Sequence, residues 1–222
     1  MVKKMSEMWK ETTIDMDVTG WKGETLHLTN VPALRNAETG KVRVFPLEVA
    51  KAEGKEMARK AGLADPRQIL LLLALYAKPG IFNGGEVFYK YHMNKILFYQ
   101  WKELEKQGFG EAVVYDEFEP ANRGPVPRNI TTDLEQLSKA GLLKTEITQW
   151  GKGPRDGRIS IKLTEQGIKL AEKLWFEAPE EIQETTLKVK ELVYPATPEQ
   201  IRNRVHKEYP EYRTSYVTED KD

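Results

Sequence analysis

The feature that most constrains the fold is a helix that is apolar on nearly every side. Residues Ile69–Tyr76 form the longest apolar run in the chain, directly after Asp65-Pro66-Arg67-Gln68. Aspartate is a good N-cap, proline suits the first helical position, and a glutamine three residues after the cap can reach back to the cap amide. The run is far shorter than the roughly 20 residues that a membrane-spanning helix needs. We therefore predict a buried core helix over 69–77 and no membrane association.

The amino-acid composition excludes several classes of chemistry. The 222 residues include no cysteine, which removes disulfides, cysteine nucleophiles and zinc fingers and favours a reducing cytoplasm. The N-terminal stretch lacks the basic start and long apolar run of a signal peptide, so we expect a cytoplasmic protein. Many lysines and glutamates without cysteine are also compatible with a thermophilic source.

Beyond the core helix, the pattern of apolar residues and turns indicates three further helices and one hairpin. Apolar residues at 159, 161 and 163 alternate with polar ones, which is typical of a half-buried strand. A glycine-rich loop over 151–157 joins this strand to a β-prone run that begins at Thr145. The expected elements are a second helix over 86–107, a strand or extended crossing over 113–118, a third helix over 129–140, a hairpin over 145–163 and a helix over 164–175.

Shorter elements are expected before this central unit. Residues 1–23 show no sustained period and are expected to be loosely structured. Two β-prone runs, 24–30 and 41–45, lie on either side of a turn at 38–40 and predict a hairpin. Pro46 then occupies a typical first helical position, and the helix is expected to end at Gly62.

Two helices are expected after the central unit. One spans 179–193, with acidic residues at its start. The other begins at the capping-box sequence Thr197-Pro198-Glu199-Gln200 and ends near Tyr209. The predicted fold class is α+β, mainly α, with a winged helix-turn-helix core, an N-terminal β-hairpin and helix element, and a C-terminal helical extension. The expected boundaries are 1–64, 65–176 and 177–222.

The order helix, helix, helix, two-stranded hairpin, helix is the winged-helix arrangement. Its DNA-binding members lay the third helix in the major groove and let the hairpin loop touch the DNA backbone. We expect Ile130, Leu134 and Leu137 to face the core. A turn of about 100° per residue then places four side chains on the outer face of the third helix: Arg128, Thr132, Glu135 and Lys139.

The charge of the chain is neutral overall and unevenly spread. Residues 66–176 carry 16 basic and 13 acidic side chains, so only this segment has a clear positive excess. The hairpin loop region contributes Lys152, Arg155 and Arg158 against Asp156. A neutral chain argues against indiscriminate nucleic-acid binding, because that mode depends on neutralising phosphates.

Four short segments resemble the YwgA-like winged-helix family, whose members are small proteins of bacteria, archaea, plasmids and phages. The family pattern is a lysine with an apolar-aromatic run, a Gly-Pro turn, a D-L-x-x-L helix and a G-L-[IL] exit. The matching segments are Asn94-Lys95-Ile96-Leu97-Phe98, Arg123-Gly124-Pro125, Asp133-Leu134-Glu135-Gln136-Leu137 and Gly141-Leu142-Leu143. The segment 206–212 also resembles the C-terminal helix of the family, so the similarity covers roughly residues 66–212. Thr164-Glu165-Gln166-Gly167 is similar to the helix start that follows the hairpin in transcriptional regulators. Relatives of the family include antitoxins and phage-associated proteins, and the resemblance implies a fold more than an activity.

The function expected from these features is double-stranded DNA binding by a transcriptional regulator or mobile-element accessory protein. The predicted DNA-binding residues are Arg128, Thr132, Lys139, Lys152, Arg155 and Arg158. The alternative is a protein-interaction module, such as an antitoxin or assembly adaptor, that makes contact through its N-terminal hairpin. A purely scaffolding role is the third possibility. A homodimer is also expected, and apolar stripes for its interface are offered by Ile182, Val189, Leu192 and Ile201.

No feature of the sequence indicates catalysis. The three histidines, His27, His92 and His206, are scattered and lack the spacing of a metal site. The glycines do not form a phosphate-binding loop, because none follows the G-x-x-x-x-G-K-[ST] spacing. The aromatic residues between Tyr89 and Trp101 favour a core helix over a stacking platform for single strands. We therefore predict no enzyme activity, metal or cofactor.

Overall fold

The computed structural model describes residues 8–77, 88–107, 115, 117–121, 124–149 and 157–213, and only the backbone of Phe88, Thr148, Gln149 and Arg158. Of the described residues, about half are helical and about a quarter lie in strands, in agreement with the α+β class. The elements in chain order are β1 (Trp9–Thr19), β2 (Thr25–Asn36), β3 (Val42–Val44), α2 (Pro46–Lys60), α3 (Arg67–Tyr76), β4 (Phe88–Tyr89), α4 (Lys90–Lys106), β5 (Phe118–Glu119), β6 (Val126–Pro127), α5 (Ile130–Lys139), β7 (Leu143–Gln149), β8 (Gly157–Leu163), α6 (Glu165–Glu177), α7 (Glu180–Val193), α8 (Pro198–Glu208) and a 3₁₀ turn (Pro210–Tyr212).

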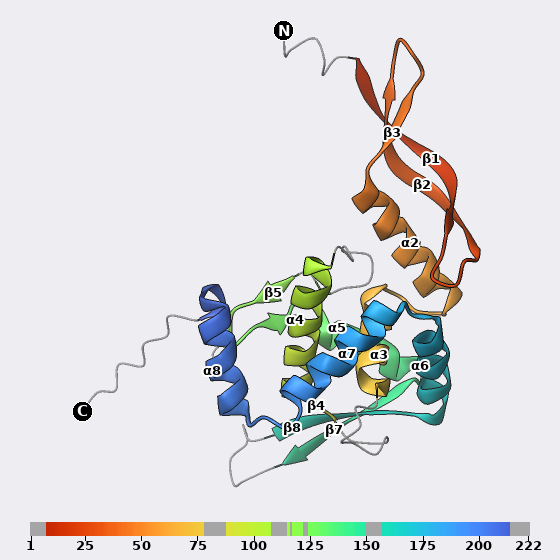
Figure 1. Cartoon of the computed structure of the whole chain (residues 1–222). Helices are drawn as coiled ribbons and strands as arrows, with labels where there is room; N and C mark the ends of the chain where they lie inside the picture. The colour runs from red at the N-terminus through yellow and green to blue at the C-terminus, as the bar shows by residue number, and fades with distance from the viewer. Residues whose placement is uncertain are drawn as a thin grey trace.

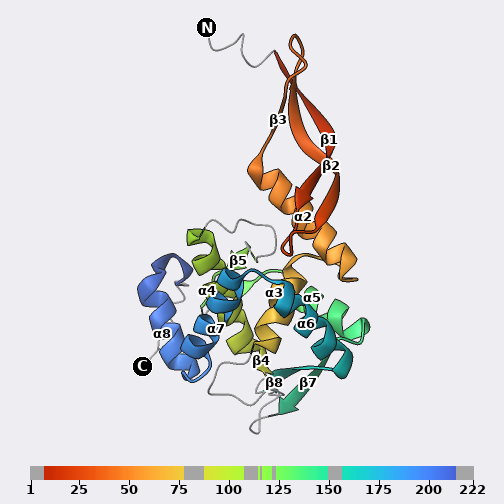
Figure 2. The same cartoon turned by 45° about the vertical axis from the view of Figure 1, so that its right-hand side comes forward.

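Strands β1–β3 and helix α2 form an arm, residues 9–60, that extends from the remaining elements (Figures 1 and 2). We call the remaining elements, residues 67–212, the body. In the arm β1 pairs with β2 and β2 pairs with β3, both antiparallel. The expectation of loose structure before residue 24 was wrong over β1. The alternate residues Ile14, Met16 and Val18 of β1 pack on the buried side chains of β2. The strand is stable because it pairs with β2, and its short apolar pattern alone did not reveal this pairing.

The arm packs on the body through a small contact. Trp21 and Met57 pack against the main hydrophobic core, and Ala58 near the end of α2 is buried in it. At the same place the Lys22 ammonium lies 2.7 Å from a carboxylate oxygen of Glu177 on α6. The predicted stop at Gly62 follows α2 closely, and this glycine has the left-handed φ of +71° that a helix end favours.

Helix α3 is the centre of the body, as its sequence predicts. Its residues from Ile69 to Ala74 are 0% exposed. Asp65 Oδ1 accepts a hydrogen bond from the Arg67 amide at 2.9 Å, so the predicted aspartate does cap this helix. The Gln68 side chain reaches back one residue further than expected, because its Oε1 accepts from the Ala64 amide at 3.1 Å.

The predicted second helix begins later than expected. Phe88 and Tyr89 are not helical but form β4, which pairs with Ile161 and Ser160 of β8. The predicted hairpin is confirmed, since β7 and β8 pair antiparallel from Leu143↔Leu163 to Gln149↔Gly157. The resulting sheet has the order β4-β8-β7 and lies against one side of the helices (Figure 1). Most of the expected 151–157 loop lies outside the described residues.

Helix α6 starts at a close contact that explains the Thr164–Gly167 motif. The Thr164 hydroxyl donates to the Gly141 carbonyl at 2.6 Å and accepts from the Gly167 amide at 3.0 Å. A Cβ at Gly167 would lie 1.8 Å from the carbonyl oxygen of Leu142. Only glycine therefore lets α6 pack against the turn between α5 and β7.

The two C-terminal helices complete the body. The predicted capping box of α8 is confirmed, since the Thr197 hydroxyl accepts from the Gln200 amide and Gln200 Oε1 accepts from the Thr197 amide. Three of the four residues expected to form a dimer interface are instead buried within this chain, because α7 and α8 pack on α4. The exposed fractions are 1% for Ile182, 1% for Val189, 3% for Ile201 and 37% for Leu192.

Candidate functional site

Helix α5 divides its side chains between core and surface as predicted. Ile130, Leu134 and Leu137 are at most 4% exposed. The residues Thr132, Glu135 and Lys139 are exposed on the opposite face, as its 3.6-residue period requires. Two of the predicted DNA-contacting residues therefore lie on one accessible helix face.

The buried face of α5 carries a polar residue that its sequence pattern did not predict. Asp133 is 1% exposed, and the Tyr115 hydroxyl donates to its Oδ2 at 2.7 Å. Arg67 Nε lies 3.5 Å from the same carboxylate, and Gln68 Nε2 donates to Gln136 Oε1 at 2.6 Å. Burial raises the pKa of Asp133, against the effect of the Tyr115 hydroxyl and the arginine. These contacts tie α5 to the start of α3 and fix which face of α5 points outward.

Arg128 does not lie on the outer face of α5, which begins only at Ile130. Its Nε donates to Glu119 and its Nη1 donates to Glu117, both at 2.9 Å. These carboxylates raise the pKa of Arg128, mainly through the hydrogen bond that Arg128 donates to Glu119, and they neutralise its charge. Glu119 lies on β5 and Glu117 lies just before it, and β5 pairs with the strand that leads to Arg128. The contact therefore depends on strand pairing and has no local sign in the sequence.

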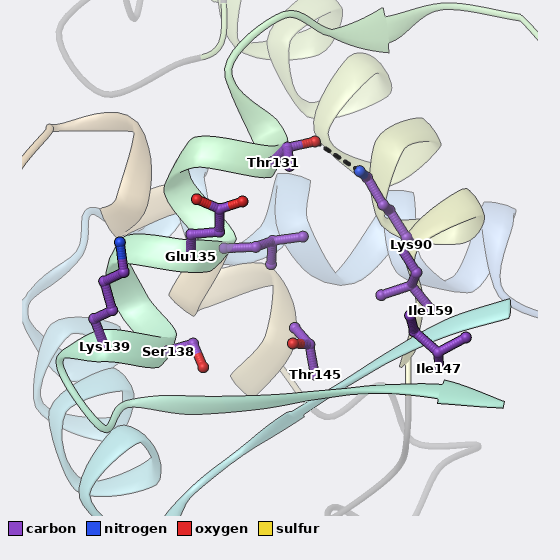
Figure 3. A pocket seen from close by; sticks show the side chains of 9 residues that line it. Lys90, Thr131, Glu135, Ser138, Lys139, Thr145, Ile147 and Ile159 are labelled. Carbon is purple, nitrogen blue, oxygen red and sulfur yellow. Dashed lines mark hydrogen bonds between the residues drawn. The ribbon is translucent and has the colours of Figure 1, made fainter. Parts of the chain in front are cut away.

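A groove with a volume of about 340 Å³ separates α5 from the hairpin of β7 and β8 (Figure 3). The side chains of α5 form one wall and those of the two strands form the other. Ile147 on β7 is 74% exposed and pairs across the hairpin with Ile159. The residues that line the groove are Lys90, Thr131, Leu134, Glu135, Ser138, Lys139, Thr145, Ile147 and Ile159.

Lys90 adds a cation to this groove, although it was not among the residues predicted to contact DNA. It is the first residue of α4, and its ammonium donates to the Thr131 hydroxyl on α5 at 2.8 Å (Figure 3). Partial burial lowers the pKa of Lys90, and the nearby Glu135 carboxylate opposes this effect. No local signal in the sequence marks Lys90, because β4, which places the start of α4 beside the hairpin, forms only by pairing with β8.

The three remaining predicted residues, Lys152, Arg155 and Arg158, follow β7 in the sequence. Arg158 lies in β8, where its backbone pairs with Thr148 at the end of the hairpin away from α6. Its side chain lies outside the described atoms, and Lys152 and Arg155 lie outside the described residues. Their role as DNA contacts stays a prediction.

Neither a metal centre nor a membrane span is found in the parts of the chain that the structure describes. Among these residues, no three histidine, aspartate or glutamate side chains cluster closely enough to hold an ion. No helix among them combines the length and apolar character needed to cross a bilayer.

Comparison with known proteins does not assign the chain to a family. No protein-family model matches the chain, and no curated protein matches its sequence. The resemblance to the YwgA-like family therefore stays a prediction that rests on the four short segments.

Proposed function

We propose that residues 65–176 form a winged helix-turn-helix and that this unit binds double-stranded DNA. The observation that carries the proposal is the order of elements, α3, β4, α4, β5, β6, α5, β7, β8, together with the sheet order β4-β8-β7, since β5 and β6 pair only with each other. In a winged helix a short strand after the first helix joins the hairpin in this way. The exposed face of α5 then lies beside the hairpin, as in proteins whose third helix enters the major groove.

In this proposal the exposed residues of α5 and of the hairpin have different roles. Thr132 and Lys139 contact base edges or phosphates from α5, and Glu135 is suited to accept a hydrogen bond from a cytosine amino group. Lys152, Arg155 and Arg158 neutralise phosphates at the hairpin. Arg128 contacts DNA only after exchanging its two glutamate partners for phosphate oxygens, which makes it a weaker contributor.

The biological setting follows from the same reasoning. A winged helix in a chain without cysteine suits a regulator or mobile-element accessory protein of the cytoplasm. The described groove carries a net charge of only +1, because Lys90 and Lys139 are opposed by Glu135. Binding then depends on the hairpin cations and on a specific site, since affinity for arbitrary duplexes follows the number of phosphates neutralised.

The test is a titration of a random duplex and a selected duplex at several salt concentrations. Changing Lys152 and Arg155 to alanine should weaken binding to both duplexes and flatten the slope of log affinity against log salt by about 2. The matched control changes Lys10 and Lys41 of the arm, which are also exposed lysines, and should leave the slope unchanged. An unchanged affinity and slope in the hairpin variant would overturn the DNA proposal.

A second candidate function, protein interaction through the arm, is favoured by a separate observation. Val42 on β3 and Phe45 and Leu47 at the start of α2 are 40%, 41% and 41% exposed. Three neighbouring apolar residues on a projecting arm suit contact with a partner protein. For this function, Phe45→Ser should abolish cross-linking to a native partner without changing the DNA titration, and the hairpin variant should do the reverse.

A further inference from the structure

Two apolar side chains in the described part of the chain are far more exposed than any other large one. Ile147 on β7 is 74% exposed and Phe176 in the last turn of α6 is 73% exposed, whereas the next is 41% exposed. Each would gain free energy by leaving water, and an aromatic ring offers the larger area. Ile147 lines a groove, whereas Phe176 projects from the end of a helix.

The groove beside Ile147 has a shape and charge that suit an apolar side chain with acidic neighbours. Its apolar surface comes from Leu134, Ile147 and Ile159, and its volume of about 340 Å³ exceeds that of a phenyl ring. Lys90 and Lys139 outnumber the single carboxylate of Glu135, so the groove carries a net charge of +1.

The surroundings of Phe176 have the opposite charge. The segment 172–181 contains Glu172, Glu177, Glu180 and Glu181 but only one cation, Lys173. Glu177 is paired with Lys22 and Glu172 accepts from the Tyr76 hydroxyl. Glu180 and Glu181 are exposed at the start of α7, and neither forms an ion pair with another described residue. Phe176 is therefore an apolar knob next to two available carboxylates.

We propose that Phe176 of one copy of this chain inserts into the groove between α5 and the hairpin of a second copy. Glu180 and Glu181 then face Lys90 and Lys139 across the contact. The surfaces on the two copies are different, so each copy keeps one free knob and one free groove. Association is consequently head-to-tail and extends into rings or chains, unlike the symmetric dimer expected from α7 and α8.

This contact would also regulate the function proposed above, and that consequence rests on the DNA proposal. The knob lies against Leu134, Glu135 and Lys139 of α5, which are the residues beside or on its exposed face. A copy with an occupied groove cannot lay the same face into the major groove. Self-association and duplex binding are therefore mutually exclusive at one α5.

The test of self-association needs no DNA. Sedimentation of the full chain over a range of protein concentrations should show reversible assembly that weakens as salt rises, because charges rim the contact. Phe176→Ser and Ile147→Thr should each raise the dissociation constant roughly tenfold or more, the effect expected for an anchor residue. Ile168→Ser is the matched control, since Ile168 is a 40% exposed apolar residue of the same helix α6 and should have no effect.

Mixing the two defective variants distinguishes a head-to-tail contact from any symmetric one. Phe176→Ser keeps an intact groove and Ile147→Thr keeps an intact knob, so their mixture should form dimers and nothing larger. A wild-type chain that stays monomeric at all concentrations, an effect of Ile168→Ser equal to that of Phe176→Ser, or a mixture that stays monomeric would overturn the proposal. None of these results bears on duplex binding, which is measured separately with dilute protein.

Discussion

The arm and the body stabilise their buried side chains in different ways. The arm core consists of Leu26, Leu28 and Val31, with partly buried apolar residues around them. His27 and Asp17 of the arm form a histidine–carboxylate pair at the surface, with both side chains 65% exposed. The body has a much larger apolar core, and it also buries charged and polar groups such as Lys95, Asp133 and Lys190.

This difference shows how the two regions acquire a defined structure. Apolar burial is non-directional, so the arm depends mainly on strand register and alternation. Buried polar groups need partners with fixed geometry. The Lys95 ammonium donates to the Pro125 carbonyl at 2.6 Å, and the Lys190 ammonium donates to the Ala77 carbonyl. These contacts orient α4, α7 and the segment before α5, which positions the candidate site.

The largest effect is expected when a buried leucine is changed to alanine in each of the two cores. Leu71→Ala in α3 should lower the free energy of unfolding of the whole chain by about 2–5 kcal/mol. Leu28→Ala in the arm should release only the arm, because few side chains join it to the body. Hydrogen exchange followed by mass spectrometry separates these outcomes. If Leu28→Ala also removed protection from α3, the arm and body would form one cooperative unit.

A smaller effect is expected from the buried polar contacts of α5. Asp133→Ala removes the carboxylate that accepts the hydrogen bond from the buried Tyr115 hydroxyl. This loss should lower the free energy of unfolding by about 1–3 kcal/mol. Glu135→Ala on the exposed face of the same helix is the control and should change stability by no more than about 0.5 kcal/mol. Urea denaturation of the two variants measures the difference. Equal losses would mean that Asp133 does not anchor α5.

Lys95 gives the body a dependence on pH above neutrality. Burial lowers the pKa of Lys95 to about 7, far below that of a lysine in the unfolded chain. Between these two values the unfolded chain binds the extra proton, so the free energy of unfolding should rise with pH by up to about 1.4 kcal/mol per unit. The comparison is with Lys95→Met, which should lack this contribution above pH 7. Parallel stability curves for the two proteins would contradict the expectation.

The smallest effect is expected at the contact between the arm and the body. Lys22→Ala removes the ion pair with Glu177, which is partly exposed and should contribute at most about 1 kcal/mol. Trp21 packs against the body core beside it. Because the chain has five tryptophans, the packing of the arm is followed by hydrogen exchange and not by fluorescence. A small loss of protection around Trp21 without loss of helix is expected. A complete release of the arm would show that the ion pair, and not the apolar contact, keeps the arm packed on the body.

Local patterns in the sequence were sufficient for several elements. The capped apolar helix α3, the inward stripe of α5 and the hairpin of β7 and β8 each follow from the preferences of neighbouring residues. Their period and turn chemistry act over a few residues, so no distant partner is needed to predict them. The outward position of Thr132 and Lys139 follows from the same period.

Contacts between distant segments decided the features that the sequence alone left open or led us to predict wrongly. Strand β1 depends on its pairing with β2, and β4 depends on β8, which lies more than seventy residues away. Arg128 acquires two glutamate partners from the β5 region. The apolar faces of α7 and α8 are buried because both helices pack on α4. Periodicity shows that a residue is apolar or charged and which face it occupies, but it does not identify what covers that face. The groove with Lys90 and Ile147 exists only because folding brings the starts of α4 and α5 beside the hairpin.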